Sequence, residues 1–160
     1  MTLEWMGEYR EVVEALIHYC NIYAAVYKTE KMEYRGIKYS YSQIQVLEYL
    51  LESEDKQQNM SCIAARLGIT RSNFSKIVSR LQSKGLVHKI SRPGNRKELL
   101  VTVLPLGREL YNDYSRDILR WHFSPMFEKL ESVSPADRDA FRDALFAAMG
   151  GSCFLKDMEA

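Results

Sequence analysis

The sequence predicts a mainly α (α+β) fold in which a helix-turn-helix is followed by a β-hairpin and flanked by long helices. Three observations predict it. Apolar residues recur at spacings of three and four over most of the chain. Two short helical patterns meet at a tight junction around Gly68, and stretches rich in Val and Leu follow Gly85. With 160 residues, 46% of them hydrophobic, the chain is predicted to form a single domain over residues 1–160.

The N-terminal segment is predicted to form one long amphipathic helix over residues 4–34. A helix of this length without internal caps usually packs against a partner helix, often in another subunit. Gly36 is expected to end it. Ser40 and Gln43 then form a capping box, which predicts the start of a second helix.

Two short helices are predicted next. Asn59 is a plausible N-cap for the first, and Gly68 is expected to end it. Thr70 caps the second, which ends before Gly85. The apolar positions of this second helix fall at i, i+3, i+4 and i+7, and they are Phe74, Ile77, Val78 and Leu81.

A β-hairpin and two further helices complete the chain. Strands are predicted at 86–91 and 98–104, with a turn at Arg92–Asn95. Pro105 fits the first position of a long helix, which Pro125 is expected to kink or end. Ser134 and Pro135 then open the last helix, and Gly150 and Gly151 close it.

Several classes of protein are disfavoured by composition. No charge-free stretch is long enough to span a membrane, and no signal peptide is evident, so we expect a cytoplasmic protein with no membrane partner. Cys20, Cys62 and Cys153 are odd in number and lie in no CxxC motif, which argues against disulfides and zinc. Phosphate-loop and hydrolase motifs are absent, so we expect no enzyme, no cofactor and no metal site.

The charge is divided unequally along the chain. The total is only +1, from 22 basic and 21 acidic residues. Between Lys56 and Lys97, however, ten basic residues occur without one Asp or Glu, while the remaining 118 residues carry 12 basic and 21 acidic groups. A basic segment that coincides with a helix-turn-helix and a hairpin is typical of a surface that faces the phosphates of double-stranded DNA.

The second short helix carries polar residues on the face opposite its apolar positions, as expected of a helix that enters the major groove. Arg71, Ser72 and Asn73 at its N-terminus are the best candidates for base contacts. The hairpin tip is predicted to reach an adjacent minor groove, with Arg96 as first choice for the contact. The full set of predicted DNA-binding residues is Arg71, Ser72, Asn73, Ser75, Lys76, Ser79, Arg80, Arg92, Arg96 and Lys97.

These motifs resemble the MarR (multiple antibiotic resistance regulator) family of winged helix-turn-helix transcription factors. The resemblance is carried by residues 40–47, 63–69 and 81–87 and extends to Gly107. It implies a winged helix-turn-helix fold with long N- and C-terminal dimerisation helices. By this resemblance the recognition helix is 71–84, the wing is 91–97, the DNA-binding lobe is 40–105, and the dimerisation helices are 1–36 and 106–160.

The resemblance also implies a function. Members of this family bind pseudo-palindromic operators as homodimers, and we expect this chain to act as a repressor that a small aromatic or anionic effector releases. No effector-binding residue is assigned. Two alternatives stay open: a redox-sensing regulator that uses a thiol such as Cys20, and a winged-helix module for protein contacts. Cys20 lies in a hydrophobic stripe, where burial and low reactivity are usual.

Overall fold

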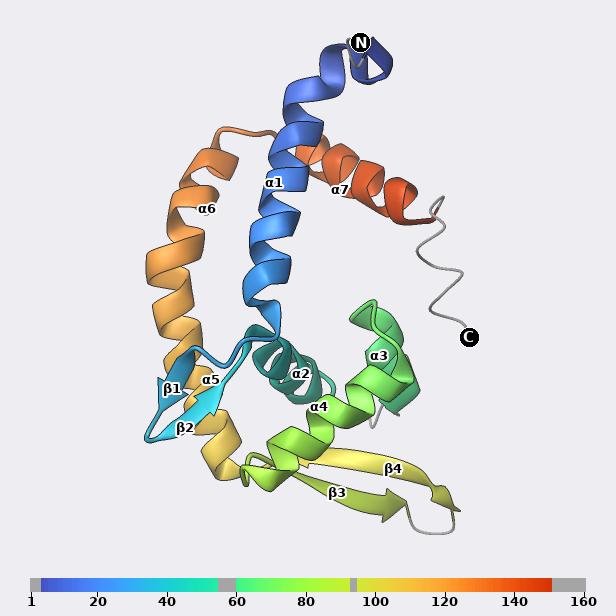
Figure 1. Ribbon diagram of the computed structural model, residues 1–160, viewed down its shortest axis with the longest axis vertical. Helices are drawn as coiled ribbons and strands as arrows, with labels where there is room; N and C mark the ends of the chain where they lie inside the picture. The colour runs from blue at the N-terminus through green and yellow to red at the C-terminus, as the bar shows by residue number, and fades with distance from the viewer. Residues whose placement is uncertain (1–3, 55–59, 93–94, 151–160) are drawn as a thin grey trace. The chain divides into compact units, whose positions relative to one another are not determined.

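The computed structural model describes residues 4–54, 60–92 and 95–150 (Figure 1). The chain forms two compact units. The first unit is residues 1–45 and the second is residues 46–160. The boundary falls within one helix, α2 (Tyr41–Glu52).

The first unit begins with a 3₁₀ segment, η1 (Glu4–Tyr9), followed by α1 (Arg10–Tyr27). The expectation of one helix over residues 4–34 is wrong at both ends. Gly7 has non-helical backbone angles (φ 51°, ψ −136°) within η1, and the segment after α1 is not helical. Two short strands, β1 (Met32–Tyr34) and β2 (Ile37–Tyr39), pair as an antiparallel hairpin instead. The N-terminal helix is therefore shorter than predicted, and a short β-hairpin follows it.

The turn residues explain why a hairpin replaces the end of that helix. Tyr34 pairs with Ile37, so Arg35 and Gly36 form a two-residue turn. Both have positive φ, +48° and +80°, as a type I′ turn requires. Gly36 adopts this conformation without steric cost, and the turn twists in the sense that two paired strands need.

The capping box that opens α2 is present in part. The side chain of Gln43 accepts a hydrogen bond from the Ser40 backbone N–H at 3.4 Å. The Ser40 hydroxyl hydrogen-bonds to the Ser42 hydroxyl at 2.9 Å. One half of the predicted reciprocal pair is thus confirmed, and both residues are almost fully buried.

The second unit contains the predicted helix-turn-helix and hairpin. Its elements are α3 (Met60–Arg66), α4 (Arg71–Ser83), β3 (Val87–Arg92) and β4 (Asn95–Val103). The two strands pair in regular antiparallel register up to Ser91, after which the register shifts. The predicted N-cap Asn59 and the hairpin tip, residues 93–94, lie outside the described residues.

Both helices of the motif end as the sequence predicts, at glycines with positive φ. At the end of α4, the Leu86 N–H donates to the Leu81 carbonyl at 3.0 Å and the Gly85 N–H donates to the Gln82 carbonyl at 3.0 Å. This is a Schellman motif, with Gly85 at φ +70°. A matching pair of bonds, with Gly68 at φ +65°, ends the segment after α3.

The core of the second unit joins the helix-turn-helix to the hairpin. Residues from α2, α3, α4, both hairpin strands and the start of α5 are at most 5% exposed. Burial of this many aliphatic and aromatic side chains is the main favourable term in folding. They are Val46, Leu47, Leu50, Ile63, Ala64, Phe74, Ile77, Val78, Leu81, Leu86, Val87, Val103 and Leu110.

The C-terminal part of the second unit is helical. After α5 (Pro105–Ile118), a π-helical turn, η3 (Leu119–Phe123), leads directly into α6 (Ser124–Glu131), and α7 (Pro135–Gly150) follows. The backbone thus stays helical across Pro125. The π-helical turn inserts an extra residue before the proline, whose missing N–H would otherwise interrupt the ladder. Within the described ranges, no helix is long and apolar enough to cross a membrane.

Gly107 provides a direct test of this packing. It is buried in the first turn of α5, and a Cβ there would lie 2.4 Å from the Leu86 carbonyl oxygen and 2.9 Å from a Val103 methyl carbon. In an open helix, Gly to Ala would stabilise the fold. Here we expect Gly107→Ala to lower the free energy of unfolding by about 1–3 kcal/mol, measured by urea denaturation.

Asn112→Ala is the control for that measurement. Asn112 is an exposed residue of the same helix, and we expect a change within about 0.5 kcal/mol. A Gly107→Ala variant as stable as the parent would show that α5 does not pack this closely against the end of α4 and β4.

Candidate nucleic-acid interface

Helix α4 has one buried face and one exposed face. Phe74, Val78 and Leu81 are 0% exposed and Ile77 is 5% exposed. Its first turn is capped by Thr70, whose hydroxyl oxygen accepts a hydrogen bond from the Asn73 N–H at 3.1 Å. The helix is therefore fixed both along and around its axis, with its polar side toward solvent.

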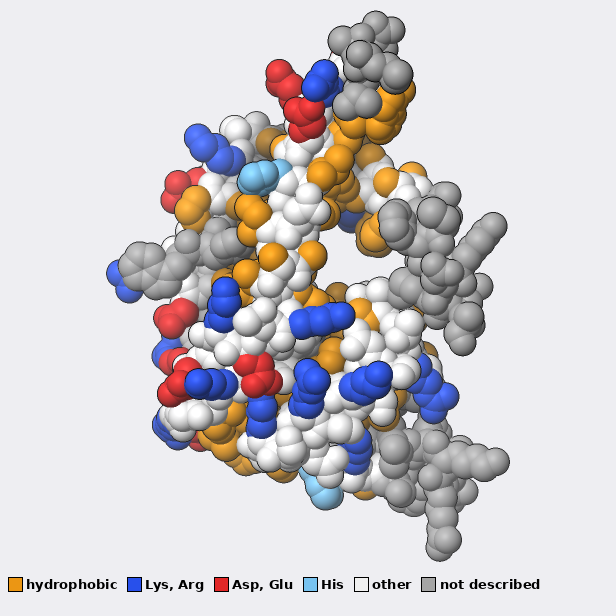
Figure 2. Space-filling view, in the orientation of Figure 1, with side chains coloured by type: hydrophobic (Ala, Val, Ile, Leu, Met, Phe, Trp, Pro, Cys, Tyr) orange, Lys and Arg blue, Asp and Glu red, His pale blue; other side chains and the backbone are white. Residues whose placement is uncertain are grey.

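The exposed face of α4 is positively charged. Arg71, Lys76 and Arg80 are exposed, and within the described part of the chain they form no ion pair with a carboxylate. Figure 2 shows blue Lys and Arg side chains gathered over this part of the molecule. A cationic surface without internal counter-charges is suited to bind a polyanion.

Not every cation of the basic segment belongs to this surface. Arg66, at the end of α3, pairs with Glu52 at 2.9 Å and lies over the ring of Tyr49, 4.7 Å from its centroid. Its guanidinium also lies 3.5 Å from the Ser53 hydroxyl. Arg66 therefore links α3 to α2 and does not extend the cationic face of α4.

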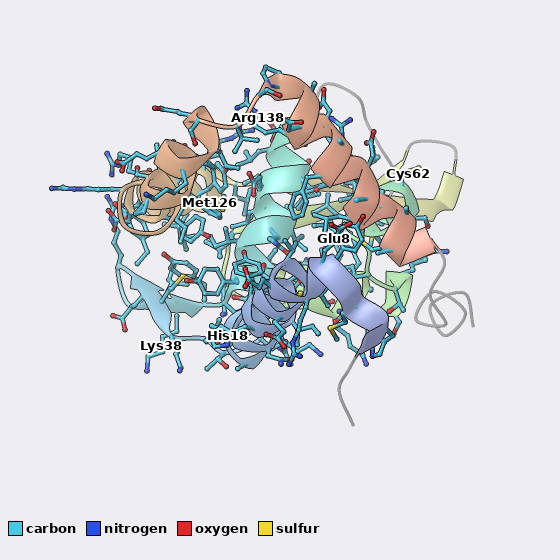
Figure 3. All side chains as sticks on the ribbon, turned by 90° about the horizontal axis from the view of Figure 1, so that it is seen from above. Glu8, His18, Lys38, Cys62, Met126 and Arg138 are labelled. Carbon is cyan, nitrogen blue, oxygen red and sulfur yellow. The ribbon has the colours of Figure 1, made fainter. Side chains whose placement is uncertain are left out.

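The described cysteines are both exposed. Cys62 lies on α3 (Figure 3), and Cys20 lies on α1. The hydrophobic stripe predicted burial of Cys20, and this expectation is wrong because α1 has no buried residue. Cys153 lies outside the described residues. Where side chains are described, no group of three or more His, Cys, Asp or Glu is arranged to hold a metal ion.

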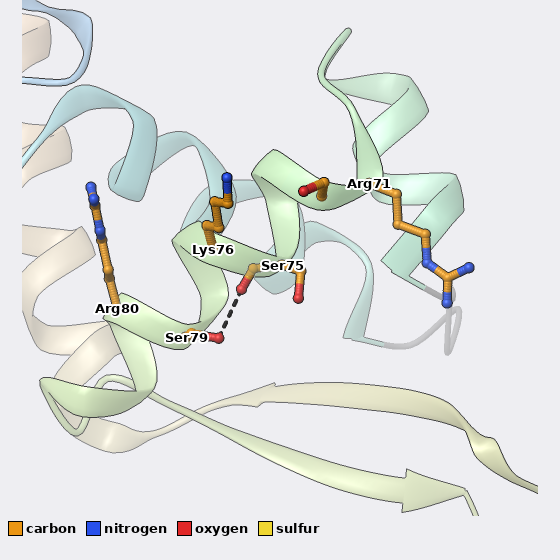
Figure 4. A pocket seen from close by; sticks show the side chains of 6 residues that line it. Arg71, Ser75, Lys76, Ser79 and Arg80 are labelled. Carbon is orange, nitrogen blue, oxygen red and sulfur yellow. Dashed lines mark hydrogen bonds between the residues drawn. The ribbon is translucent and has the colours of Figure 1, made fainter. Parts of the chain in front are cut away.

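Six of the ten predicted DNA-binding residues line one open groove along α4, with a volume of about 610 Å³ (Figure 4). They recur at helical spacing, which places three cations and three serines along one side of α4. Small hydroxyl side chains leave room for another molecule to approach the helix backbone. The lining residues are Arg71, Ser72, Ser75, Lys76, Ser79 and Arg80.

The hydroxyls of this groove are not equivalent. The Ser79 hydroxyl donates to the Ser75 carbonyl at 2.9 Å and accepts a hydrogen bond from the Lys89 ammonium at 2.8 Å. Its only proton is thus used within the protein, so that Ser79 can still accept but cannot donate in this conformation. No such bond occupies Ser72 within the described residues.

Of the other four predicted residues, one lies outside the groove and three have side chains that the structure does not describe. Asn73 is partly buried and is not among its lining residues. Arg92 lies at the end of β3, and Arg96 and Lys97 lie in β4, but the side chains of residues 91–99 are outside the described part. Lys89 belongs to the basic segment of the sequence, but no local sequence pattern indicates its contact with α4.

A second ionisable cluster lies where α5 meets α2 in the same unit. Burial raises the pKa of Tyr111 to about 12, and the Glu48 carboxylate adds to the shift through its charge and through a hydrogen bond from the phenol. The charge of Glu52, the partner of Arg66, contributes in the same direction. The contact of Tyr111 with Glu48 thus connects α5 with α2, the helix to which Arg66 links α3.

The helix-turn-helix with its hairpin defines a winged-helix protein. The sequence model of the MarR family matches residues 36–98, so this segment of the chain is similar to that family. The resemblance noted in the sequence is thereby confirmed. No curated protein sequence matches the chain.

Solved structures share the fold over most of the chain. Sco3205 of Streptomyces coelicolor, a MarR family regulator in complex with DNA, is 18% identical with a TM-score of 0.69, covering 89% of this chain and 86% of its own. PcaV of the same organism, in complex with its natural ligand, is 16% identical with a TM-score of 0.63, covering 94% and 97%. BpsR of Bordetella bronchiseptica, whose DNA binding is regulated by 6-hydroxynicotinic acid, is 18% identical with a TM-score of 0.57, covering 87% and 98%.

The raised pKa of Tyr111 predicts a defined pH dependence. Because the pKa is about 12 in the folded protein and about 10 in an unfolded chain, Tyr111 contributes stability that is fully present below pH 10. This contribution is lost as the pH rises toward 12. We expect Glu48→Gln to lower the Tyr111 pKa, but not to its ordinary value, because burial is the larger cause.

Titration of ring-labelled tyrosines by NMR, with Tyr111→Phe to assign the signal, measures this shift. Asp113→Asn is a control, since Asp113 pairs with Arg116 and is not a cause of the Tyr111 shift. A Tyr111 signal that titrates identically with and without Glu48 would contradict the assigned cause.

Proposed function

We propose that the protein is a sequence-specific regulator of transcription that inserts α4 into the major groove of double-stranded DNA. The observation that carries this proposal is the groove along α4, where three cations and three serines occur on one face and no carboxylate compensates them among the described residues. The resemblance of the fold to Sco3205, which was solved with DNA, supports the same docking. The regulator would act on cytoplasmic DNA.

Within this docking the groove residues divide into two roles. Arg71, at the N-terminus of α4, presents a forked guanidinium suited to the two acceptors of a guanine. Lys76 and Arg80, farther along the helix, bind backbone phosphates, which sets affinity without sequence preference. The wing residues Arg92, Arg96 and Lys97 are proposed to contact the adjacent minor groove and its phosphates.

The regulator is proposed to act as a homodimer through its long helices. In the first unit, Trp5, Tyr9 and Ile22 are 56–75% exposed. In the second unit, Phe141 and Phe146 of α7 are 51% and 62% exposed. A soluble protein rarely leaves this many large apolar residues uncovered, and a second copy of the chain would bury them. The dimer would place two recognition helices about 34–36 Å apart, matching a pseudo-palindromic operator.

A small aromatic or anionic effector is proposed to release the repressor. PcaV was solved with its natural ligand, and BpsR is regulated by 6-hydroxynicotinic acid. The first unit contains a cluster of tyrosines suited to an aromatic molecule, in which Tyr23 lies within 6.1 Å of the rings of Tyr19 and Tyr41 and accepts a hydrogen bond from Gln45 at 2.7 Å. An effector that shifts the spacing of the two recognition helices would remove the second half-site contact.

A thiol switch is a second candidate, and the exposure of Cys20 favours it. Peroxide treatment of the parent and of Cys20→Ser distinguishes the two mechanisms. Loss of DNA binding only in the parent would assign the response to Cys20, and equal loss in both would remove Cys20 from the mechanism.

Two substitutions in the groove separate base contacts from phosphate contacts. Arg71→Lys retains the charge but loses the fork, so we expect about 1–3 kcal/mol less discrimination at one operator position and an unchanged salt dependence. Lys76→Met removes a charge, so we expect a slope of log affinity against log salt that is about 0.9 less steep per subunit. Selection of bound genomic fragments measures the base preference of each variant. Salt titration on the enriched sequence then measures the slope.

Lys129→Met is the matched control, because Lys129 is an exposed cation of α6, away from the groove. We expect neither its affinity nor its slope to change. A parent protein that enriches no fragment, or binds with no salt dependence, would overturn the proposed function and favour a module for protein contacts.

The dimer is tested on α7. We expect Phe146→Glu to dissociate the protein to monomers and to reduce operator affinity by at least tenfold, because the avidity of the second half-site is lost. Light scattering measures the mass, and circular dichroism confirms that the monomer stays folded. Arg138→Ala, at an exposed polar position of the same helix, is the control. A parent protein that is monomeric would contradict the proposed assembly.

A further inference from the structure

We propose that Lys89, on the first strand of the hairpin, is a phosphate-binding residue that contacts the DNA backbone at the junction of α4 and β3. This inference rests on the proposed function, and it adds to the interface a cation from outside the recognition helix. The observation that carries it is the hydrogen bond from the Lys89 ammonium to the Ser79 hydroxyl, at 2.8 Å, on the exposed face of α4.

The path of the DNA backbone places a phosphate at this junction. In the proposed docking α4 occupies the major groove and the hairpin tip reaches the adjacent minor groove. One sugar-phosphate strand separates any major groove from its neighbouring minor groove. That strand must therefore pass between α4 and the hairpin, where the Lys89 ammonium lies.

The side chain of Lys89 is directed to α4 by the strand itself. Side chains alternate along a strand, and Val87, two residues earlier, is 1% exposed in the core beneath α4 while His88 is exposed. Lys89 shares the face of Val87, and it pairs with Val101 in the regular part of the hairpin, before the register shift after Ser91. The position of the Lys89 ammonium is therefore set by a regularly paired part of the strand.

The local chemistry leaves this ammonium able to bind an anion. An ammonium has three N–H donors, and one of them bonds to Ser79. Its partner is a neutral hydroxyl, and no ion pair of Lys89 with a carboxylate occurs among the described residues. Ser79 in turn is fixed by its bond to the Ser75 carbonyl. Ser79 is therefore a positioning residue that holds the cation in place before DNA arrives.

Lys89→Met tests the proposal, because methionine keeps an unbranched apolar stem and removes only the charged end. On a long mixed-sequence duplex we expect the affinity at low salt to fall about tenfold, with the slope of log affinity against log salt about 0.9 less steep per subunit. The loss should be equal on the selected operator, since a phosphate contact carries no base preference. Lys89→Arg should keep the parent's slope, and Lys129→Met should match the parent.

Ser79 is tested by Ser79→Ala and Ser79→Thr. Alanine leaves the charge of Lys89 but removes its positioning partner, so we expect a few-fold lower affinity with the parent's slope, and threonine, which keeps the hydroxyl, should restore the affinity. A Lys89→Met variant with the parent's slope would overturn the phosphate contact while leaving DNA binding by α4 intact. A parent protein that binds no DNA would instead overturn the proposed function on which this inference rests.

Discussion

Burial of one face of α4 is the constraint on which the rest of the second unit depends. Four apolar side chains, Phe74, Ile77, Val78 and Leu81, are almost completely removed from water, and each contributes about 1.5–3 kcal/mol relative to an exposed side chain. Because successive residues of a helix are rotated by a fixed angle, this burial also fixes where the other residues point. The cations and serines of the groove face solvent because their neighbours along the helix are buried.

The same constraint extends to the hairpin. The Schellman turn at Gly85 ends α4 and leads without a linker into Leu86 and Val87, which are 0% and 1% exposed. The strand that follows is thus anchored at its first residues in the core that holds α4. Gly107 adds a contact from the other side, since only a residue without a side chain fits against the Leu86 carbonyl. Helix, turn, strand and α5 therefore form one packed arrangement.

Sequence periodicity predicts the order of these elements, but neither their packing nor the interruptions of the helices. The helix-turn-helix and the hairpin follow from spacing and from glycines at helix ends. The hairpin at residues 32–39 was missed because its three-residue strands are too short to show alternation, and its turn depends on positive φ at Arg35 as well as at Gly36. The π-helical turn before Pro125 was also missed, since no local pattern indicates an extra residue in a helix.

The site divides in the same way. The groove residues share one helical face, so the period that predicts the core also predicts them. Two contacts between different elements could not be predicted from the sequence, namely Lys89 with Ser79 and Arg66 with Glu52. Both depend on tertiary packing, which brings residues 10 and 14 positions apart into contact. The ion pair of Arg66 with Glu52 also reduces the uncompensated charge of the basic segment, because Arg66 belongs to that segment but is neutralised within the protein.

The placement of charge on α4 opposes the intrinsic preference of a helix. The N-terminal end of a helix carries partial positive charge and favours acidic residues by about 0.3–1 kcal/mol each. Helix α4 has no acidic residue in its first turn and begins with Arg71. A helix selected for stability alone would have the opposite charge there. An incoming phosphate would remove the conflict, because it is attracted both by the cation and by the N–H groups of Arg71 and Ser72, which precede the N–H that Thr70 caps. The local rule is thus broken at the position where a polyanion would restore it, as is typical of residues that serve binding at some cost to the free protein.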